Sequence, residues 1–330
     1  MTSKRNKKPD TLNRRKFLNI AGIATAGMLP LAAWSKQQDV SEQSVTGNHF
    51  IPGPFPDNKI ASIIEEKIIC IEPGRFLGQG TEFALNTNGH VVIKKRVVEP
   101  NRYIGWPTIA KTREGKLIVA FSGDRDAHVC PYGKTQMISS DDNGKTWSEP
   151  ETITSTALDD RDAGLIQTQR GTLLVSWFTS LAFERPNYEA AYHKYFRIGE
   201  KIPVETKKLW LGNWVRRSED MGKTWQEPVR TAGTAPHGPI SLKNGDLLYI
   251  ATLEKDRKYS IIAEKSTDDG KSWKVIGEIP RPKDYVASLV EPHVVELKSG
   301  KLIAMIRNEP KDISQCFLLQ SESTDGGKTW

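Results

Sequence analysis

The sequence predicts an all-β fold in which four-stranded sheets repeat around a common axis, as the blades of a β-propeller do. Two internal repeats carry this prediction. The octet Ser-x-Asp-x-Gly-x-(Thr/Ser)-Trp occurs four times, beginning at Ser140, Ser218, Ser266 and Ser323. Before each octet comes a sixteen-residue pattern, and its four copies align without gaps on Gly115, Gly171, Gly245 and Gly300. Self-similarity at about 50 residues is typical of propeller blades, so we expect one blade per repeat.

Residues 1–34 predict an export signal that precedes the fold. The paired Arg14 and Arg15 follow a basic stretch and lead into an apolar run that ends at Trp34. This arrangement resembles a twin-arginine signal peptide, and an uncleaved N-terminal anchor is the alternative. Either interpretation predicts that the protein leaves the cytoplasm, and the twin-arginine interpretation predicts a periplasmic or extracellular protein that uses the twin-arginine export machinery. Residues 35–60 are polar with three prolines and are expected to be a linker, which leaves 61–330 for the propeller.

The charge balance argues against a nucleic-acid partner. The whole chain has 47 Lys and Arg against 40 Asp and Glu, a net charge of +7. Residues 1–36 hold eight cations and one anion, so they account for the entire excess and leave the remainder close to neutral. Nucleic-acid binding depends on a basic surface, which the predicted domain lacks. No run of uncharged apolar residues after position 40 is long enough to span a membrane.

Each octet has the residues of a tight turn between two strands. The aspartate accepts hydrogen bonds from backbone N–H groups, the glycine takes a positive φ, and the tryptophan packs onto the blade. We therefore interpret these aspartates as structural. A unit then consists of a strand, a glycine turn, a second strand, a third strand, the octet turn and a fourth strand.

One connection between repeats is longer than the others. The spacings between the aligned glycines are 56, 74 and 55 residues, so the second contains an insertion from about Ser180 to Leu211. It is rich in aromatic and charged residues and is expected to include a short helix near Tyr188–Phe196. A loop of this length in a compact domain usually has a function. Because Trp330 ends the fourth octet, we also expect the propeller to be incomplete at the C-terminus.

The topology of a propeller predicts which side chains meet. Residues just before each innermost strand and just after each second strand converge on one central pocket, with the octet turns at the opposite face. Those before the inner strands are Trp106, Arg161, Asp162, His237, Glu291 and His293. Those after the second strands are Asp124, Arg125, Asp126 and His128 in one blade, and Arg307, Asn308 and Glu309 in another.

The octets are Asp-boxes, and from about Tyr103 to Trp330 their placement resembles the sialidase (neuraminidase) superfamily of BNR-repeat proteins. The resemblance implies a six-bladed β-propeller and an exo-α-sialidase-like glycoside hydrolase. It also implies three arginines that bind the substrate carboxylate, an aspartate as acid/base, and a tyrosine nucleophile activated by a glutamate.

Matched residue by residue, Glu291 stands at the activating glutamate, Arg307 at the second arginine, and Asp126 in the region of the acid/base aspartate. The first arginine of the family belongs to an Arg-Ile-Pro motif, which is replaced here by Gly105-Trp106-Pro107. Arg161, which aligns with Gly105 one blade later, is the candidate that supplies a guanidinium instead. The third arginine and the tyrosine would lie beyond Trp330.

Two segments dense in charge, 123–134 and 159–164, allow two interpretations. Alternating Asp and Arg can form a salt-bridge network that only rigidifies the rim. Alternatively, Asp126 and Asp162 are general acid and base, and Arg125 and Arg161 orient them or bind the sugar. Three histidines on separate blades are weak evidence for a metal, so no metal and no cofactor are expected. Proton transfer by His237 or His293 is the more plausible use of these imidazoles.

Three functions remain open on the sequence alone. The favoured one is an exported hydrolase that removes a terminal, acidic sugar from a glycan, although Trp106 would also suit stacking on a neutral ring. The second is a polysaccharide lyase that eliminates across a uronic acid, with His237 or His293 as base. The third is a propeller that binds glycans without turnover.

Overall fold

The computed structural model describes residues 67–77, 82–85, 91–95, 98–184, 198–255, 258–283, 285–312 and 316–330. The predicted signal, the predicted linker and the predicted helix near 188–196 lie outside these ranges. Ile68–Trp330 form one compact unit. Within the described ranges, no helix is both long enough and apolar enough to cross a membrane.

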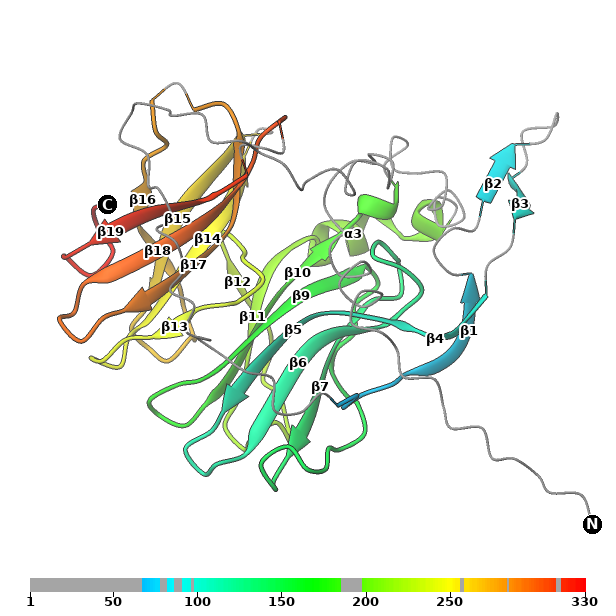
Figure 1. The fold of residues 1–330 in the computed structure, drawn as a ribbon, viewed down its shortest axis with the longest axis horizontal. Coiled ribbons are helices and arrows are strands. Elements are labelled where there is room, and N and C mark those ends of the chain that lie inside the picture. The colour runs from blue at the N-terminus through cyan, green and yellow to red at the C-terminus, as the bar shows by residue number, and fades with distance from the viewer. Residues whose placement is uncertain are drawn as a thin grey trace, which may run out of the picture. The chain divides into compact units, whose positions relative to one another are not determined.

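Four antiparallel sheets follow one another along the chain and form a propeller-like arrangement of four blades (Figure 1). Blade 1 contains β5 (Tyr103–Lys111), β6 (Leu117–Arg125), β7 (Lys134–Ser140) and β8 (Glu151–Thr154). Blade 2 contains β9 (Asp159–Gln167), β10 (Leu173–Ser180), β11 (Gly212–Ser218) and β12 (Val229–Thr231). Blade 3 contains β13 (Ile240–Ser241), β14 (Leu247–Lys255), β15 (Lys258–Ser266) and β16 (Lys274–Ile279). Blade 4 contains β17 (Ser288–Glu296), β18 (Leu302–Glu309) and β19 (Leu318–Ser323).

Two short strand pairs precede the blades. β1 (Pro73–Leu77) pairs with β4 (Val98–Asn101), and β2 (Glu82–Leu85) pairs with β3 (Val91–Lys95), both antiparallel. The all-β prediction is therefore confirmed, with one blade for each of the four aligned repeats.

The two predicted turns have the expected chemistry. The hairpin glycines Gly115, Gly171, Gly245 and Gly300 have φ between +85° and +90°. In the first octet the Ser140 hydroxyl donates to Asp142 Oδ1 at 2.8 Å, and the Thr146 N–H donates to the same oxygen at 2.9 Å. The Trp147 indole N–H closes the turn on the Gly144 carbonyl at 3.1 Å. The octet aspartate is thus occupied by its own turn, as predicted.

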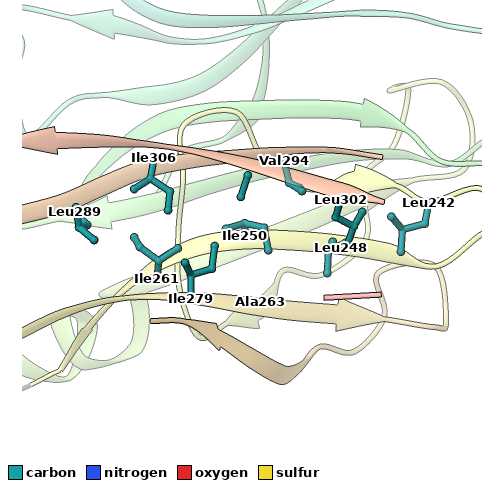
Figure 2. Packing of buried hydrophobic residues seen from close by; sticks show 11 residues of the cluster. Leu242, Leu248, Ile250, Ile261, Ala263, Ile279, Leu289, Val294, Leu302 and Ile306 are labelled. Atoms are coloured by element: carbon teal, nitrogen blue, oxygen red, sulfur yellow. The ribbon is translucent and has the colours of Figure 1, made fainter. Parts of the chain in front are cut away.

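The hydrophobic core lies between neighbouring blades. Figure 2 shows Val294 and Ile306 of blade 4 pointing toward Leu248 and Ile250 of blade 3, and these four side chains are at most 2 % exposed. A second cluster joins blades 1 and 2 and includes the fully buried Trp177. A blade with neighbours on both sides has both faces of its sheet covered. Its strands are therefore nearly continuous runs of apolar residues, such as Leu247–Ala251 in β14 of blade 3.

The insertion leaves blade 2 at the end where β9 begins, since Ser180 of β10 pairs with Asp159 of β9. It contains the 3-10 helix η2 (Ala182–Glu184) and α3 (Val204–Trp210). Buried Ala182 and Phe183 pack against Val129 and Cys130, which follow β6 of blade 1. The insertion is thus anchored at the end of the blades where the sequence predicts the site.

Candidate functional site

Three inner strands share a backbone feature at their predicted site position. Trp106, Asp162 and Glu291 occupy equivalent places in the aligned repeats and have φ of 52°, 57° and 49°. At each of them the ladder between the inner and second strand shifts register. A bulge whose residue has a left-handed backbone conformation changes the direction of that residue's side chain. For a non-glycine residue this conformation costs about 1–2 kcal/mol of stability. Strained residues cluster at functional sites, so this position, repeated in three blades, is a candidate functional position.

Blade 3 follows a different path because Pro236 occupies this position, and proline has a fixed negative φ. Gly238 takes the positive φ instead, at +71°. A Cβ built on Gly164 would lie 2.5 Å from Gly238 Cα, so the backbones of blades 2 and 3 touch here. Asp162 and His237 therefore both lie within two residues of one close backbone contact.

Arg161 is held between aromatic rings from two blades. Its guanidinium carbon lies 4.7 Å from the centre of the Trp106 ring and 5.5 Å from that of Phe178. Its Nη2 lies 3.3 Å from His128 Nε2, and the His128 ring is 4.8 Å from the Trp106 ring. Only 9 % of Arg161 is exposed, and its Nε has no hydrogen-bond partner among the described residues.

Asp162 is a buried carboxyl beside charges of both signs. It is 8 % exposed, its N–H donates to Ser122 Oγ at 2.9 Å, and its Oδ1 has no partner within the described part of the chain. Burial raises the pKa of Asp162 to about 6, with Glu291 adding to the rise and Arg161 opposing it. The carboxyl consequently exchanges its proton close to neutral pH.

Glu291 is paired with Arg307 across the first two strands of blade 4. Arg307 Nη1 lies 2.7 Å from Glu291 Oε2, and Arg307 Nη2 lies 2.9 Å from Glu309 Oε1. The side chains of Arg307 and Glu291 are 30 % and 36 % exposed, so both remain accessible to a ligand. The bulge in β17 makes this pair possible, because Arg307 is opposite Val290 in the ladder.

His237 and His293 bring blades 3 and 4 together at the same level. Their ring centres are 5.4 Å apart and their planes meet at 70°. Burial, and then the neighbouring His237, lower the pKa of His293, so this imidazole stays neutral at neutral pH. His237 is exposed, whereas His293 Nδ1 is buried without a partner among the described residues.

Arg125 has a structural position. Its side chain is 0 % exposed and lies 2.7 Å from Asp159 Oδ1, and it also donates to the carbonyls of Asp160 and His128. Asp126 lies on the loop after β6, with Oδ1 3.7 Å from Arg102 Nη1. The salt-bridge interpretation of segment 123–134 therefore holds for Arg125, which lies beneath the site without reaching its surface.

The sequence analysis placed His128 among the residues that converge on the pocket but did not predict its contacts, which are with Arg161 and Trp106. It missed the role of Asp159. Asp159 was part of a charge-dense segment, but it is the buried counter-ion of Arg125. The alternation of β9 contained a signal for it: a residue two positions before Arg161 in a strand lies on the same face.

The described residues contain no group of three or more His, Cys, Asp or Glu side chains that could hold a metal ion. Cys70, Cys130 and Cys316 are free thiols. The side chains that the structure brings together here carry carboxyl, guanidinium, imidazole and indole groups.

Comparison with known proteins found one matching family and several similar folds. Residues 201–330, less than half of the chain, match the family described as the BNR repeat-like domain. Among solved structures, a Dyadobacter fermentans protein of unknown function is 23% identical over 79% of this chain and 72% of its own, with a TM-score of 0.54.

A Hadza microbial sialidase is 19% identical over 74% of this chain and 51% of its own, with a TM-score of 0.50. At these identities the likeness is one of fold, and the chain spans about half the length of that sialidase. A search of curated proteins found no match.

Proposed function

We propose that this protein is an exported glycoside hydrolase with a six-bladed, sialidase-like propeller. It removes a terminal, acidic sugar from a glycan by acid/base catalysis, without metal or cofactor. Export through the twin-arginine pathway to the periplasm or the extracellular space is part of this proposal and rests on residues 1–34.

The observation that carries the proposal is the buried carboxyl of Asp162, beside Arg161 and near Glu291. A general acid must hold a proton near its working pH, and burial gives Asp162 that property. Asp126 is the alternative acid, and the family resemblance favours it. Glu291 can act as the partner carboxylate because Arg307 holds it in a fixed orientation at 2.7 Å.

The preference for an acidic sugar follows from two guanidinium groups at the cluster. Arg307 is partly exposed, and Arg161 has a buried Nε that no described residue satisfies. Guanidinium groups bind carboxylates by charge-assisted hydrogen bonds. Trp106 contacts Arg161 and His128, which favours support of the guanidinium over stacking on a neutral sugar ring.

The histidine pair supports a second candidate function. A neutral His293 beside an exposed His237 can remove the proton α to a carboxylate, as a lyase acting on a uronic acid requires. The third possibility, binding without turnover, predicts that Asp162→Asn leaves glycan binding intact and that wild type releases no product.

The test uses the full chain with a chromogenic sialoside, a chromogenic glucuronide and a uronic-acid polysaccharide. Release of the chromophore, lost in Asp162→Asn and kept in Asp142→Asn of the first octet, supports the hydrolase. An unsaturated product detected by its ultraviolet absorbance supports the lyase, with His293→Gln as the inactive variant. Binding of any of these ligands without product from wild type overturns both catalytic proposals.

Export is tested separately by fractionating cells that express the chain. Wild type is expected outside the cytoplasm, and Arg14→Lys with Arg15→Lys is expected inside it. Equal distribution of the two proteins would contradict twin-arginine export.

A further inference from the structure

We propose that His128 is a positioning residue that fixes the guanidinium of Arg161 as the carboxylate-binding group of this site. The proposal deepens the proposed function and rests on it for the identity of the ligand. It goes beyond the family resemblance, because neither His128 nor Arg161 matches a residue of the family's arginine clamp.

The geometry around Arg161 restricts the guanidinium on several sides. Trp106 lies along it at 4.7 Å, Phe178 at 5.5 Å, and His128 Nε2 lies 3.3 Å from Nη2. Tyr103 contacts the His128 ring edge-on, with centres 6.4 Å apart. Arginine loses side-chain entropy when it is ordered, so a guanidinium already held in place binds an anion at lower cost.

The contact with Arg161 also determines which ring nitrogen of His128 carries the proton. A guanidinium has only donors, so Nε2 of His128 must accept, and the proton of the neutral ring must be on Nδ1. A protonated His128 ring could no longer accept the hydrogen bond from Arg161, and it would place a third cation beside Arg161 and Arg125. Burial, followed by the charges of Arg161 and Arg125, lowers the pKa of His128 to about 3. The titratable group on the other side, Tyr103, has a raised pKa and is also neutral.

Two buried hydrogen-bond donors remain for the ligand. Arg161 Nε and His128 Nδ1 are both without partners among the described residues, and unsatisfied buried donors are rare in proteins. The Nε–H of a guanidinium can complement a planar anion such as the carboxylate of an acidic sugar. The inference therefore assigns carboxylate recognition to blades 1 and 2, while Arg307 belongs to blade 4.

The first test measures the tautomer and titration of His128 by nitrogen NMR of histidine-labelled full chain, with the His128→Gln spectrum giving the assignment. Because the pKa of His128 is lowered to about 3, we expect a neutral ring protonated on Nδ1 down to about pH 5. In Arg161→Met we expect the apparent pKa of His128 to rise by about one unit or more, because a neighbouring cation is removed. A neutral His128 ring that carries its proton on Nε2, or a His128 ring that becomes charged above about pH 5 in wild type, overturns the proposal.

The second test measures binding of glucuronic acid and N-acetylneuraminic acid by calorimetry. His128→Leu removes the hydrogen-bond acceptor of Arg161. We expect this variant to bind the acidic sugar about 10-fold or more weakly than wild type does, as loss of a hydrogen bond to a charged group implies. His128→Gln, whose amide oxygen replaces Nε2, is expected to regain most of that affinity. Tyr132→Phe on the same loop is the matched control with unchanged affinity.

Equal affinities in wild type, His128→Leu and His128→Gln overturn the positioning role. Thermal unfolding of each variant separates loss of fold from loss of position. If neither acid binds wild type, the proposed acidic-sugar specificity fails, and the NMR test still decides whether His128 fixes Arg161.

Discussion

Replacing Asp162 with asparagine is expected to stabilise the protein at alkaline pH while removing its catalytic acid. Asp162 is buried and has a raised pKa, so its ionised form is disfavoured in the folded state. Asparagine has nearly the same shape, carries no charge and tolerates the left-handed backbone found here. The change therefore removes an electrostatic cost without disturbing the bulge.

The magnitude follows from the pKa and its sign from linkage. A rise from 3.8 to about 6 means that the folded state binds the proton more tightly than the unfolded state. Asp162 thus destabilises the fold increasingly as pH rises between these two values. The full cost is about 3 kcal/mol at about pH 8, and roughly half of it is present at about pH 5. Asp162→Asn should recover up to that amount at each pH.

The assay is urea unfolding of the full chain and of Asp162→Asn at these two pH values. Taking the difference between the proteins cancels all other titrating groups. Asp220 of the second octet provides a control of opposite sign, because hydrogen bonds from Thr224 lower its pKa to about 2. Asp220→Asn should lower stability near neutral pH, and that loss should shrink as pH falls through the range from about 4 to about 2. A variant of Asp162 that is less stable than wild type at pH 8, or whose advantage does not grow with pH, would refute the reasoning.

Three further outcomes follow from burial and close packing. Arg125→Met leaves the buried Asp159 without its counter-ion and should cost about 3–5 kcal/mol in urea unfolding, whereas Arg125→Met with Asp159→Leu should recover most of it. Gly164→Ala pushes a methyl group against the backbone of Gly238 and should cost about 1–3 kcal/mol, and an unchanged midpoint would contradict the close approach of blades 2 and 3. Ile250→Ala should cost about 2–5 kcal/mol and Ile250→Val about 0.5–1.5, and equal effects would show that this interface is loosely packed.

The repeats predicted the fold because turn chemistry is local. An octet such as Ser140–Trp147 contains the donors, the acceptor and the glycine that define its own turn, so its conformation is determined without distant contacts. The gapless alignment on Gly115 and its equivalents then fixed which strands pair. The order of the strands was therefore enough to predict that Trp106, Asp162 and Glu291 lie at the end of the inner strands that faces the predicted pocket.

Side-chain partners were harder to predict, because they depend on how blades approach one another. Arg125 and Arg161 have similar sequence surroundings, each beside an aspartate. The guanidinium carbon of Arg125 lies 5.2 Å from the centre of the Trp106 ring and that of Arg161 lies 4.7 Å from it, but Arg125 is completely buried against Asp159 and Arg161 is 9 % exposed. The difference depends on contacts with residues far along the chain, which a repeat pattern does not specify.

The recurring bulge also means that three of the four blades present an exchangeable side chain at the same place. Between the bulge and the hairpin glycine the ladder is regular in each of these blades, so a substitution at Trp106, Asp162 or Glu291 leaves that part of the ladder intact. New chemistry can then arise one blade at a time, by single changes that do not require the rest of the scaffold to adapt. In blade 3, where Pro236 closes this route, change must come instead through His237.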